Sequence, residues 1–156
     1  MASGSYQQVV GDVIGIDKST VSRCVAKFCQ GLVDKKHLFI HIPRTEVEKT
    51  RTKGNFFDIG GFPSTIAIID SFYVPIIAPS HDEDNYVNRK GWHSINVQGM
   101  TDADNKFINV VAKWPGSTHD SFIFRTSSIH THLEVNNTRI EHGLVLGDSG
   151  YGLSRF

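Results

Sequence analysis

The sequence has little of what marks secreted and membrane-spanning proteins. It contains only two cysteines, Cys24 and Cys29, which are too few for a disulfide scaffold and are typical of free thiols in a reducing compartment. No run of about 18 apolar residues occurs, and this excludes an ordinary membrane-spanning helix. The opening residues, MASGSYQQ, show no basic segment followed by an apolar one, so we expect no secretory signal. Together these absences predict an intracellular protein.

The chain also lacks net charge, because 16 basic residues balance 16 acidic ones. The balance is uneven: residues 1–53 contain nine Lys/Arg and five Asp/Glu, whereas residues 54–156 contain seven and eleven. A basic first part suggests that it lies near an anion, although ordinary solvated charges would give the same imbalance. With 156 residues, 39% of them hydrophobic, the chain can form one ordinary domain, or a small domain with an appendage.

Residues 6–35 have the pattern of two consecutive helices. Tyr6–Ile14 places its aliphatic side chains on one helical face, Gly15 interrupts the pattern, and Asp17 is suited to cap a second helix from Lys18. A short helix, a glycine turn and a longer helix are typical of a helix-turn-helix, although any helical hairpin can have this layout. We expect a core-facing stripe on the second helix, formed by Val21, Val25, Phe28, Cys29 and Leu32.

The start of this second helix is polar and basic. In a helix-turn-helix, the early residues of the second helix reach the major groove, while basic groups contact phosphates. The candidate DNA-binding residues are Lys18, Ser19, Ser22, Arg23 and Lys27.

Residues 43–63 have the composition of a connector. Residues 45–48, TEVE, have capping-box spacing, which predicts a short charged helix. Three aromatic side chains follow among glycines, and we expect all three to form the base of the next domain's core: Phe56, Phe57 and Phe62.

The remaining chain alternates apolar runs with turn-forming segments. Three strands are predicted at Thr65–Ile77, His93–Met100 and Lys106–Trp114, where the turn residues between the last two indicate a hairpin. A helix is expected at Ser121–Ser128 and a fourth strand at Gly143–Leu146. Three meandering strands, a helix and a further strand predict an α/β fold with a mixed sheet.

Three aspartates lie where these strands and turns end or bend. Asp70 follows the run TIAII, Asp120 lies on the turn after Pro115-Gly116, and Asp148 follows GLVLG. Clustered carboxylates resist joint ionisation unless a cation compensates them, and hard divalent cations prefer oxygen ligands. The three residues are therefore candidates for an Mg²⁺ or Mn²⁺ site, whereas each one alone has the simpler interpretation of a helix cap or turn residue.

Four segments carry a resemblance to a known family: IDSFYVPIIAP, YVNRKGWHSINVQ, FINVVAKWPGSTHDSFIFR and LGDSGY. They resemble the signature blocks of the PIF/Harbinger transposases and the Harbinger transposase-derived nucleases. The similarity runs from about residue 4 to the last residue and includes QQVVGDVIGIDKSTVSRCV, which favours the DNA-binding interpretation of the first two helices.

The resemblance implies a partial ribonuclease H-like domain preceded by a small helix-turn-helix-like segment. We expect the boundaries to be 1–42 for that segment, 43–63 for the connector and 64–156 for the nuclease core. In such a fold the first and fourth strands lie side by side, which would bring Asp70 and Asp148 together with Asp120 close by. These three are the expected catalytic and metal-binding residues, in a two-metal cleavage of phosphodiester bonds.

Other implied roles concern the substrate and partners. His119, Arg89 and Lys90 are expected beside the metal ligands or the DNA, and Arg125 could hold a phosphate of the substrate, although solvated surface charge is an equal explanation for the cations. The family also implies DNA and a Myb-like/SANT DNA-binding protein as partners, no membrane, and localisation in the nucleus, with some protein in the cytoplasm.

The chain departs from the family pattern in three places. Asp70 is followed by Ser71-Phe72-Tyr73 instead of Gly-Thr-His, and Gly152 replaces the usual proline. The family takes its last carboxylate, a glutamate, from a helix well beyond GDSGY, and the 156 residues end before it. Two hypotheses follow: a metal-dependent DNA nuclease weakened or inactivated by the missing glutamate, or a non-catalytic nuclear remnant that binds DNA or protein.

Overall fold

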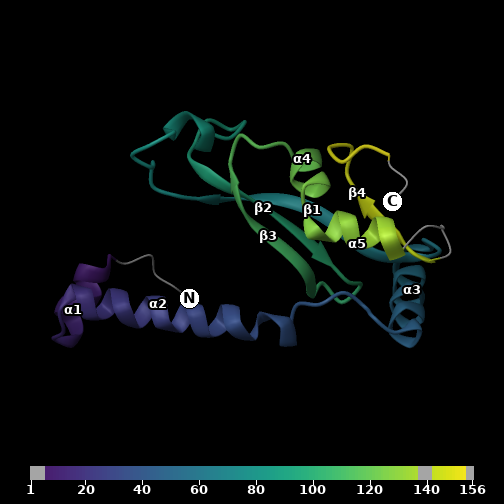
Figure 1. The fold of residues 1–156 in the computed structure, drawn as a ribbon, viewed down its shortest axis with the longest axis horizontal. Helices are drawn as coiled ribbons and strands as arrows, with labels where there is room; N and C mark the ends of the chain where they lie inside the picture. The colour runs from purple at the N-terminus through teal and green to yellow at the C-terminus, as the bar shows by residue number, and fades with distance from the viewer. Residues whose placement is uncertain (1–5, 137–141, 154–156) are drawn as a thin grey trace. The chain divides into compact units, whose positions relative to one another are not determined.

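A computed structural model describes residues 6–136 and 142–153 of the chain (Figure 1). The chain divides into two compact units, Met1–Phe39 and Ile40–Phe156, each of which is described by itself.

The first unit consists of helices α1 (Gln7–Ile14) and α2 (Lys18–Lys35), followed by the short 3₁₀ helix η1 (Lys36–Leu38). Helix α1 ends at Gly15, whose φ of 70° is the left-handed conformation that glycine adopts most readily. Asp17 caps α2, because its carboxylate accepts a hydrogen bond from the Ser19 N–H at 2.7 Å. The two helices and their cap are as predicted.

The predicted core-facing stripe on α2 is wrong for most of its members. Val21 is buried, but Val25, Phe28, Cys29 and Leu32 are exposed. The physical reason is that α1 has only eight residues, and its Gly11 packs against the start of α2, near Lys18 and Val21. In the part of the chain that the structure describes, the remaining apolar face of α2 stays open to solvent.

The second unit begins with helix α3 (Glu46–Gly60), which lies within the predicted connector. The predicted capping box is present: Thr45 Oγ1 accepts a hydrogen bond from the Glu48 N–H, and Glu48 accepts one from the Thr45 N–H. The helix is longer than the short one expected, since it continues to Gly60 and is followed by the cap residue Gly61, whose φ is 68°. Only Phe56 of the three predicted core phenylalanines is buried; Phe57 and Phe62 are exposed. Phe57 is turned about 100° around α3 from Phe56, and Phe62 lies beyond the end of the helix.

A four-stranded mixed sheet forms the centre of this unit. Its strands are β1 (Thr65–Pro75), β2 (Ser94–Thr101), β3 (Phe107–Pro115) and β4 (Leu144–Gly147), arranged in the order β3-β2-β1-β4. Strands β1, β2 and β3 form an antiparallel meander, whereas β4 is parallel to β1. The predicted α/β class is therefore confirmed, and the topology is consistent with a ribonuclease H-like fold.

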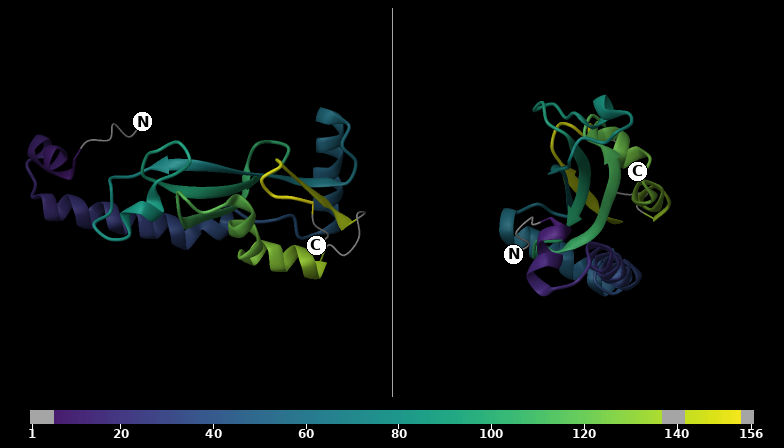
Figure 2. Two further views of the ribbon diagram at one scale, coloured as in Figure 1. Left: turned by 90° about the horizontal axis from the view of Figure 1, so that it is seen from above. Right: turned by 90° about the vertical axis from the view of Figure 1, so that its left-hand side faces the viewer.

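Helices α4 (Asp120–Arg125) and α5 (Ser128–Asn136) cover one face of the sheet, and the 3₁₀ helix η2 (Glu83–Tyr86) lies in the β1–β2 connection (Figures 1 and 2). A single helix over residues 121–128 was predicted, but Thr126 and Ser127 separate two. Their hydroxyls donate to the carbonyls of Phe122 and Phe124, in competition with the helical ladder. The buried core between helices and sheet contains Ile66, Ala67, Ile69, Met100, Ile108, Phe124, Ile129 and Leu133.

Candidate functional site

The parallel pairing of β1 and β4 brings two of the predicted aspartates to neighbouring strands. Ile69 pairs with Gly147, and the next residues along each strand are Asp70 and Asp148. Asp70 lies within β1, one position beyond the part of that strand that pairs with β4, and is exposed. Asp148 opens the turn after β4, where its Oδ1 accepts a hydrogen bond from the Gly150 N–H at 2.9 Å.

Asp120 is the first residue of α4, after the tight turn that follows β3. The interpretation of Asp120 as an N-cap does not hold, because His119 is the N-cap residue of α4. The Asp120 carboxylate instead reaches the sheet, where its Oδ1 accepts a hydrogen bond from Asn96 Nδ2 at 2.9 Å. This bond joins the start of α4 to the first half of β2.

Asp120 and Asp148 converge on Gly150. A Cβ atom at Gly150 would lie 3.0 Å from Asp148 Oδ1 and 3.5 Å from Asp120 Oδ2. The two oxygens are therefore no farther apart than the sum of these distances. Two carboxylates this close repel each other unless a cation compensates their charge.

Asp70 is placed differently from the other two. Successive strand residues point to opposite faces, so Asp70 shares the exposed face of Ile68 and Phe72, while Ser71 points to the face that α4 covers. Its Oδ1 accepts a hydrogen bond from the N–H of Ser71 at 2.7 Å, which folds the carboxylate back along its own strand. Whether all three carboxylates share a cation stays a prediction.

The donor chemistry of these residues fits a hard divalent cation. Each carboxylate has one oxygen held by an N–H group, and none of the described residues donates a hydrogen bond to the other oxygen. However, among residues 6–136 and 142–153 no three His, Cys, Asp or Glu side chains are gathered into a group that could hold a metal ion. The carboxylates supply suitable ligands, and two of the three lie together.

Tyr151 lies three residues after Asp148, in the segment that follows β4. Tyr151 OH and Ser71 Oγ lie 2.7 Å apart and share a hydrogen bond, while the tyrosine ring makes an edge-to-face contact with Phe124. Burial raises the pKa of Tyr151 well above its ordinary value of 10.0; the bond to Ser71 opposes this, and the negative charges of the three aspartates raise the pKa further. The phenol therefore stays neutral and can donate a hydrogen bond at neutral pH.

Sequence reasoning missed the polar side chains beneath α4. Ser94, Asn96 and Gln98 alternate along β2 and are almost fully buried. Alternating polar residues ordinarily indicate the solvent-facing side of a strand, so the sequence pattern predicts that these three side chains are exposed. The Oδ1 atom of Asn96 and both amide atoms of Gln98 have no hydrogen-bond partner among the described protein groups. A polar lining under a helix is unusual for a core and is typical of a functional site.

The other predicted site residues are exposed, and no described contact joins them to the aspartates. His119 lies next to Asp120, but its side chain makes no capping bond. Arg89 and Lys90 lie in the β1–β2 connection, and Arg125 Nε donates to the Ser121 carbonyl within α4. In the first unit, the predicted DNA-binding side chains on α2 are all exposed: Lys18, Ser19, Ser22, Arg23 and Lys27.

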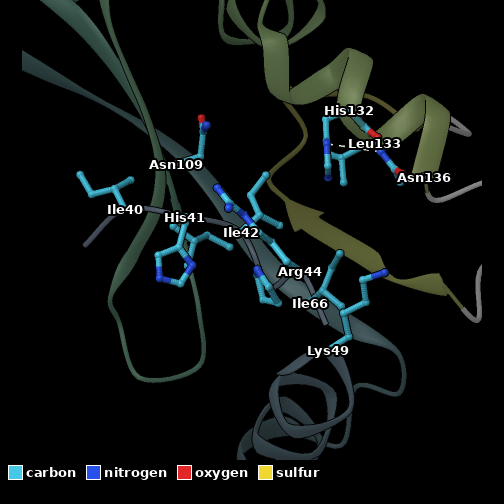
Figure 3. Close-up of a pocket in the computed structure, with 12 residues that line it drawn as sticks. Ile40, His41, Ile42, Arg44, Lys49, Ile66, Asn109, His132, Leu133 and Asn136 are labelled. Atoms are coloured by element: carbon cyan, nitrogen blue, oxygen red, sulfur yellow. Dashed lines mark hydrogen bonds between the residues drawn. The ribbon is translucent and has the colours of Figure 1, made fainter. Parts of the chain in front are cut away.

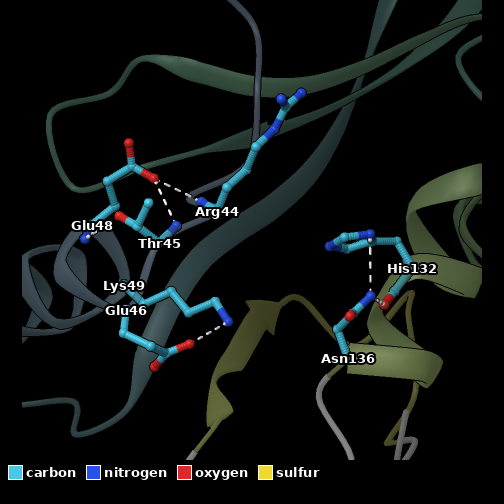
Figure 4. A network of polar contacts seen from close by, with 7 residues as sticks. All are labelled: Arg44, Thr45, Glu46, Glu48, Lys49, His132 and Asn136. Carbon is cyan, nitrogen blue, oxygen red and sulfur yellow. Dashed lines mark hydrogen bonds and ion pairs between the residues drawn. The ribbon is translucent and has the colours of Figure 1, made fainter.

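A separate cavity of about 330 Å³ lies near the start of β1 (Figure 3). Its lining is apolar at Ile66 and Leu133 and cationic at Arg44 and Lys49. Part of this polarity is already satisfied: Lys49 Nζ pairs with Glu46 at 2.9 Å, and the Asn136 side chain donates to the His132 carbonyl (Figure 4). The cavity is lined by none of the three aspartates.

Comparison with known proteins gives a consistent result. The family model described as DDE superfamily endonuclease matches residues 69–156. The proteins named "Putative nuclease HARBI1" from Bos taurus and Homo sapiens are 36% and 35% identical to the chain over 151 residues, which is 97% of this chain and 43% of each relative. "Protein ALP1-like" from Arabidopsis thaliana is 26% identical over 166 residues, covering 98% of this chain and 40% of that protein.

The chain thus spans about two fifths of the length of these curated relatives. No solved structure matches it significantly. Within the described residues, no helix has the length and apolar character needed to cross a membrane.

Proposed function

Because this chain belongs to the DDE superfamily endonucleases, among their Harbinger transposase-derived members, we propose that it is a divalent-metal-dependent nuclease that cleaves DNA phosphodiester bonds. The observation that carries the proposal is the convergence of Asp120 and Asp148 on Gly150, beside the strand that bears Asp70. The proposal is limited to the chemistry of this site, because the chain spans only about two fifths of the length of its relatives.

The chain's own residues have separable roles in this proposal. Asp120, Asp148 and Asp70 would hold Mg²⁺ or Mn²⁺ through their carboxylate oxygens. When bound, such an ion activates water and stabilises the leaving oxygen of a phosphodiester. Asn96 donates a hydrogen bond to one oxygen of Asp120, and the Gly150 N–H donates one to an oxygen of Asp148, so both carboxylates are held in place. The neutral Tyr151 phenol shares a hydrogen bond with Ser71 on β1.

The first unit supports DNA as the substrate. Five polar or basic side chains are exposed on the first half of α2. Asp17 caps this helix, which fixes the backbone that carries them. In the proposal these groups contact DNA phosphates and bases, and the protein acts in the nucleus. A Myb-like/SANT partner is part of the same hypothesis and stems from the family resemblance alone.

The test is Mn²⁺ titration of the full 156-residue chain, together with plasmid nicking in Mg²⁺ or Mn²⁺. We expect Asp120→Asn and Asp148→Asn each to weaken Mn²⁺ binding by roughly tenfold or more, because each removes one charged oxygen ligand and keeps the side-chain volume. Asp58→Asn is the matched control, since Asp58 is an exposed aspartate on α3. Equal binding by all four proteins would contradict the proposed metal site.

A second candidate function is a non-catalytic protein that binds DNA. It is favoured by the position of Asp70 on the opposite face of the sheet from Ser71 and α4, since a first ligand turned away from the others weakens a metal site. This candidate predicts DNA binding without nicking, and DNA affinity that does not change in Asp70→Asn, Asp120→Asn or Asp148→Asn.

A further inference from the structure

Asn96 has a buried side-chain amide that joins β2 to the turn before α4 and to the first residue of α4, all in the second unit. It is the third residue of β2, with 1% of its surface exposed. Its Nδ2 donates two hydrogen bonds, one to the Thr118 carbonyl and one to Asp120 Oδ1, each 2.9 Å long. Both protons of the amide are therefore used, and both are directed at the turn that delivers Asp120.

The two hydrogen bonds together fix the position and the orientation of the Asp120 carboxylate. The bond to Thr118 fixes the backbone of the turn before α4, and the bond to Asp120 fixes the carboxylate. With Oδ1 held, the plane of the carboxylate is set, and Oδ2 is the oxygen that faces Gly150 and Asp148. A side chain with one free torsion after χ1 would otherwise rotate among several orientations.

No other described group supplies this constraint. The helix does not, because His119 is the N-cap residue and none of the described N–H groups of α4 donates to the Asp120 carboxylate. Since Asn96 is neutral, it orients the carboxylate without cancelling its charge, as a cationic partner would. The remaining oxygen keeps its full attraction for a cation.

We propose that Asn96 is the positioning residue of the site: it holds Asp120 so that Oδ2 and the Asp148 carboxylate face the same point. The role in metal binding rests on the proposed function. The two hydrogen bonds from Asn96, which we call the tether, are present in the protein without metal. Asn96 does not touch the reacting atoms; it acts through Asp120.

The test compares Asn96→Ala with Asn88→Ala in the full chain. Asn88 is a matched control, because it is also buried, its Nδ2 donates to Ser94 Oγ, and its Oδ1 accepts from the Lys90 N–H, away from the aspartates. We expect Asn96→Ala to weaken Mn²⁺ binding about 10- to 100-fold, and Asn88→Ala to change it less than about twofold even if both lower stability equally. Equal weakening by the two variants would show a structural role only and would overturn the proposal.

A double-mutant cycle shows whether Asn96 acts through Asp120. In the Asp120→Asn background, Asn96→Ala should weaken Mn²⁺ binding by less than about twofold further, because the carboxylate that it positions is already absent. Fully additive losses would overturn the proposal.

A metal-free measurement separates this proposal from the proposed function and does not depend on the folding of an Asn96 variant. In ¹⁵N-labelled protein, the Asn96 side-chain amide resonances should shift strongly in Asp120→Asn and stay unchanged in Asp58→Asn. A shift with no Mn²⁺ binding by the unsubstituted chain would reject the metal site and leave the tether established. No shift would overturn the tether, whatever the metal affinity.

Discussion

The side-chain oxygens of Ser71 and Tyr151 lie 2.7 Å apart, although 80 residues separate them in the sequence. This bond joins β1 to the turn after β4 and places the tyrosine ring against Phe124 of α4. It crosses the site between the strand that carries Asp70 and the turn that carries Asp148. A contact of this kind has consequences for stability that do not depend on any ligand.

The first prediction concerns alkaline pH. Burial raises the pKa of Tyr151 above the value of 10.0 expected in the unfolded chain, so the folded state holds this proton more tightly. The stabilisation is therefore complete below about pH 10 and is lost as the pH rises from there toward the folded pKa. Urea unfolding at pH 8 and pH 10.5 should show a larger loss in the unsubstituted chain than in Tyr151→Phe. A decline in Tyr151→Phe parallel to that of the unsubstituted chain would contradict the prediction.

The second prediction concerns the start of α3. Thr45→Ala removes the side-chain acceptor for the Glu48 N–H and should lower the free energy of unfolding by about 1 kcal/mol. The N–H groups of Thr45 and Arg44 hold the pKa of Glu48 below its usual value, so the capping contribution should also fade as the pH drops through that range. Thr50→Ala makes the same chemical change in the middle of the helix. Chemical denaturation at pH 7 and pH 4 measures both effects, and equal destabilisation by the two variants would argue against the cap.

The third prediction concerns the glycine after β3. A Cβ at Gly116 would lie 2.7 Å from the Tyr86 carbonyl oxygen and 3.0 Å from that of Ser94, and backbone atoms cannot give way cheaply. Gly116→Ala should therefore destabilise the fold by about 1–3 kcal/mol. Gly54→Ala is the contrasting control: it lies inside α3 with open space around it and should stabilise the chain by about 0.5–1 kcal/mol. Thermal unfolding of both variants tests the pair, and a neutral Gly116→Ala would mean that this turn is not closely packed.

The order of elements could be predicted from the sequence because local signals were strong. Apolar runs gave the four strands, and Asp17 and Thr45 marked two helix starts that the structure has in place. The parallel pairing of β4 with β1 is a tertiary feature, and the expectation for it came from the family resemblance. The stripe on α2 failed because periodicity shows which residues share a face and not whether anything covers that face.

The site was predicted in part. Asp120 and Asp148 were identified, since each lies at a turn after an apolar run, and they converge. The face to which Asp70 points depends on the pleat of β1, which a one-residue change of register would reverse. Asn96 and Tyr151 could not be identified, because their roles arise from contacts across 24 and 80 residues of sequence.

The last prediction places the DNA contacts on α2. Lys18 and Arg23 are exposed near the start of a helix whose first turn Asp17 fixes, and Arg23 is held along the helix by bonds to the Ser19 carbonyl and Thr20 Oγ1. Each cation that neutralises a DNA phosphate releases counterions, so it contributes about one to the slope of log affinity against log salt. Replacing Lys18 and Arg23 together with alanine should weaken binding of duplex DNA and reduce that slope by about two.

The control must change the charge of the whole chain by the same amount. Lys106→Ala combined with Lys113→Ala does so in the second unit, on the hairpin formed by β2 and β3. If general electrostatic attraction governed binding, both double variants would lower the affinity and the slope alike. If α2 is the binding surface, only the Lys18/Arg23 variant does, because counterion release occurs where cations lie against phosphates and not in proportion to net charge. Fluorescence anisotropy of a labelled duplex between 50 and 200 mM salt separates the two outcomes, and equal slopes for the two variants would remove α2 from the DNA-binding hypothesis.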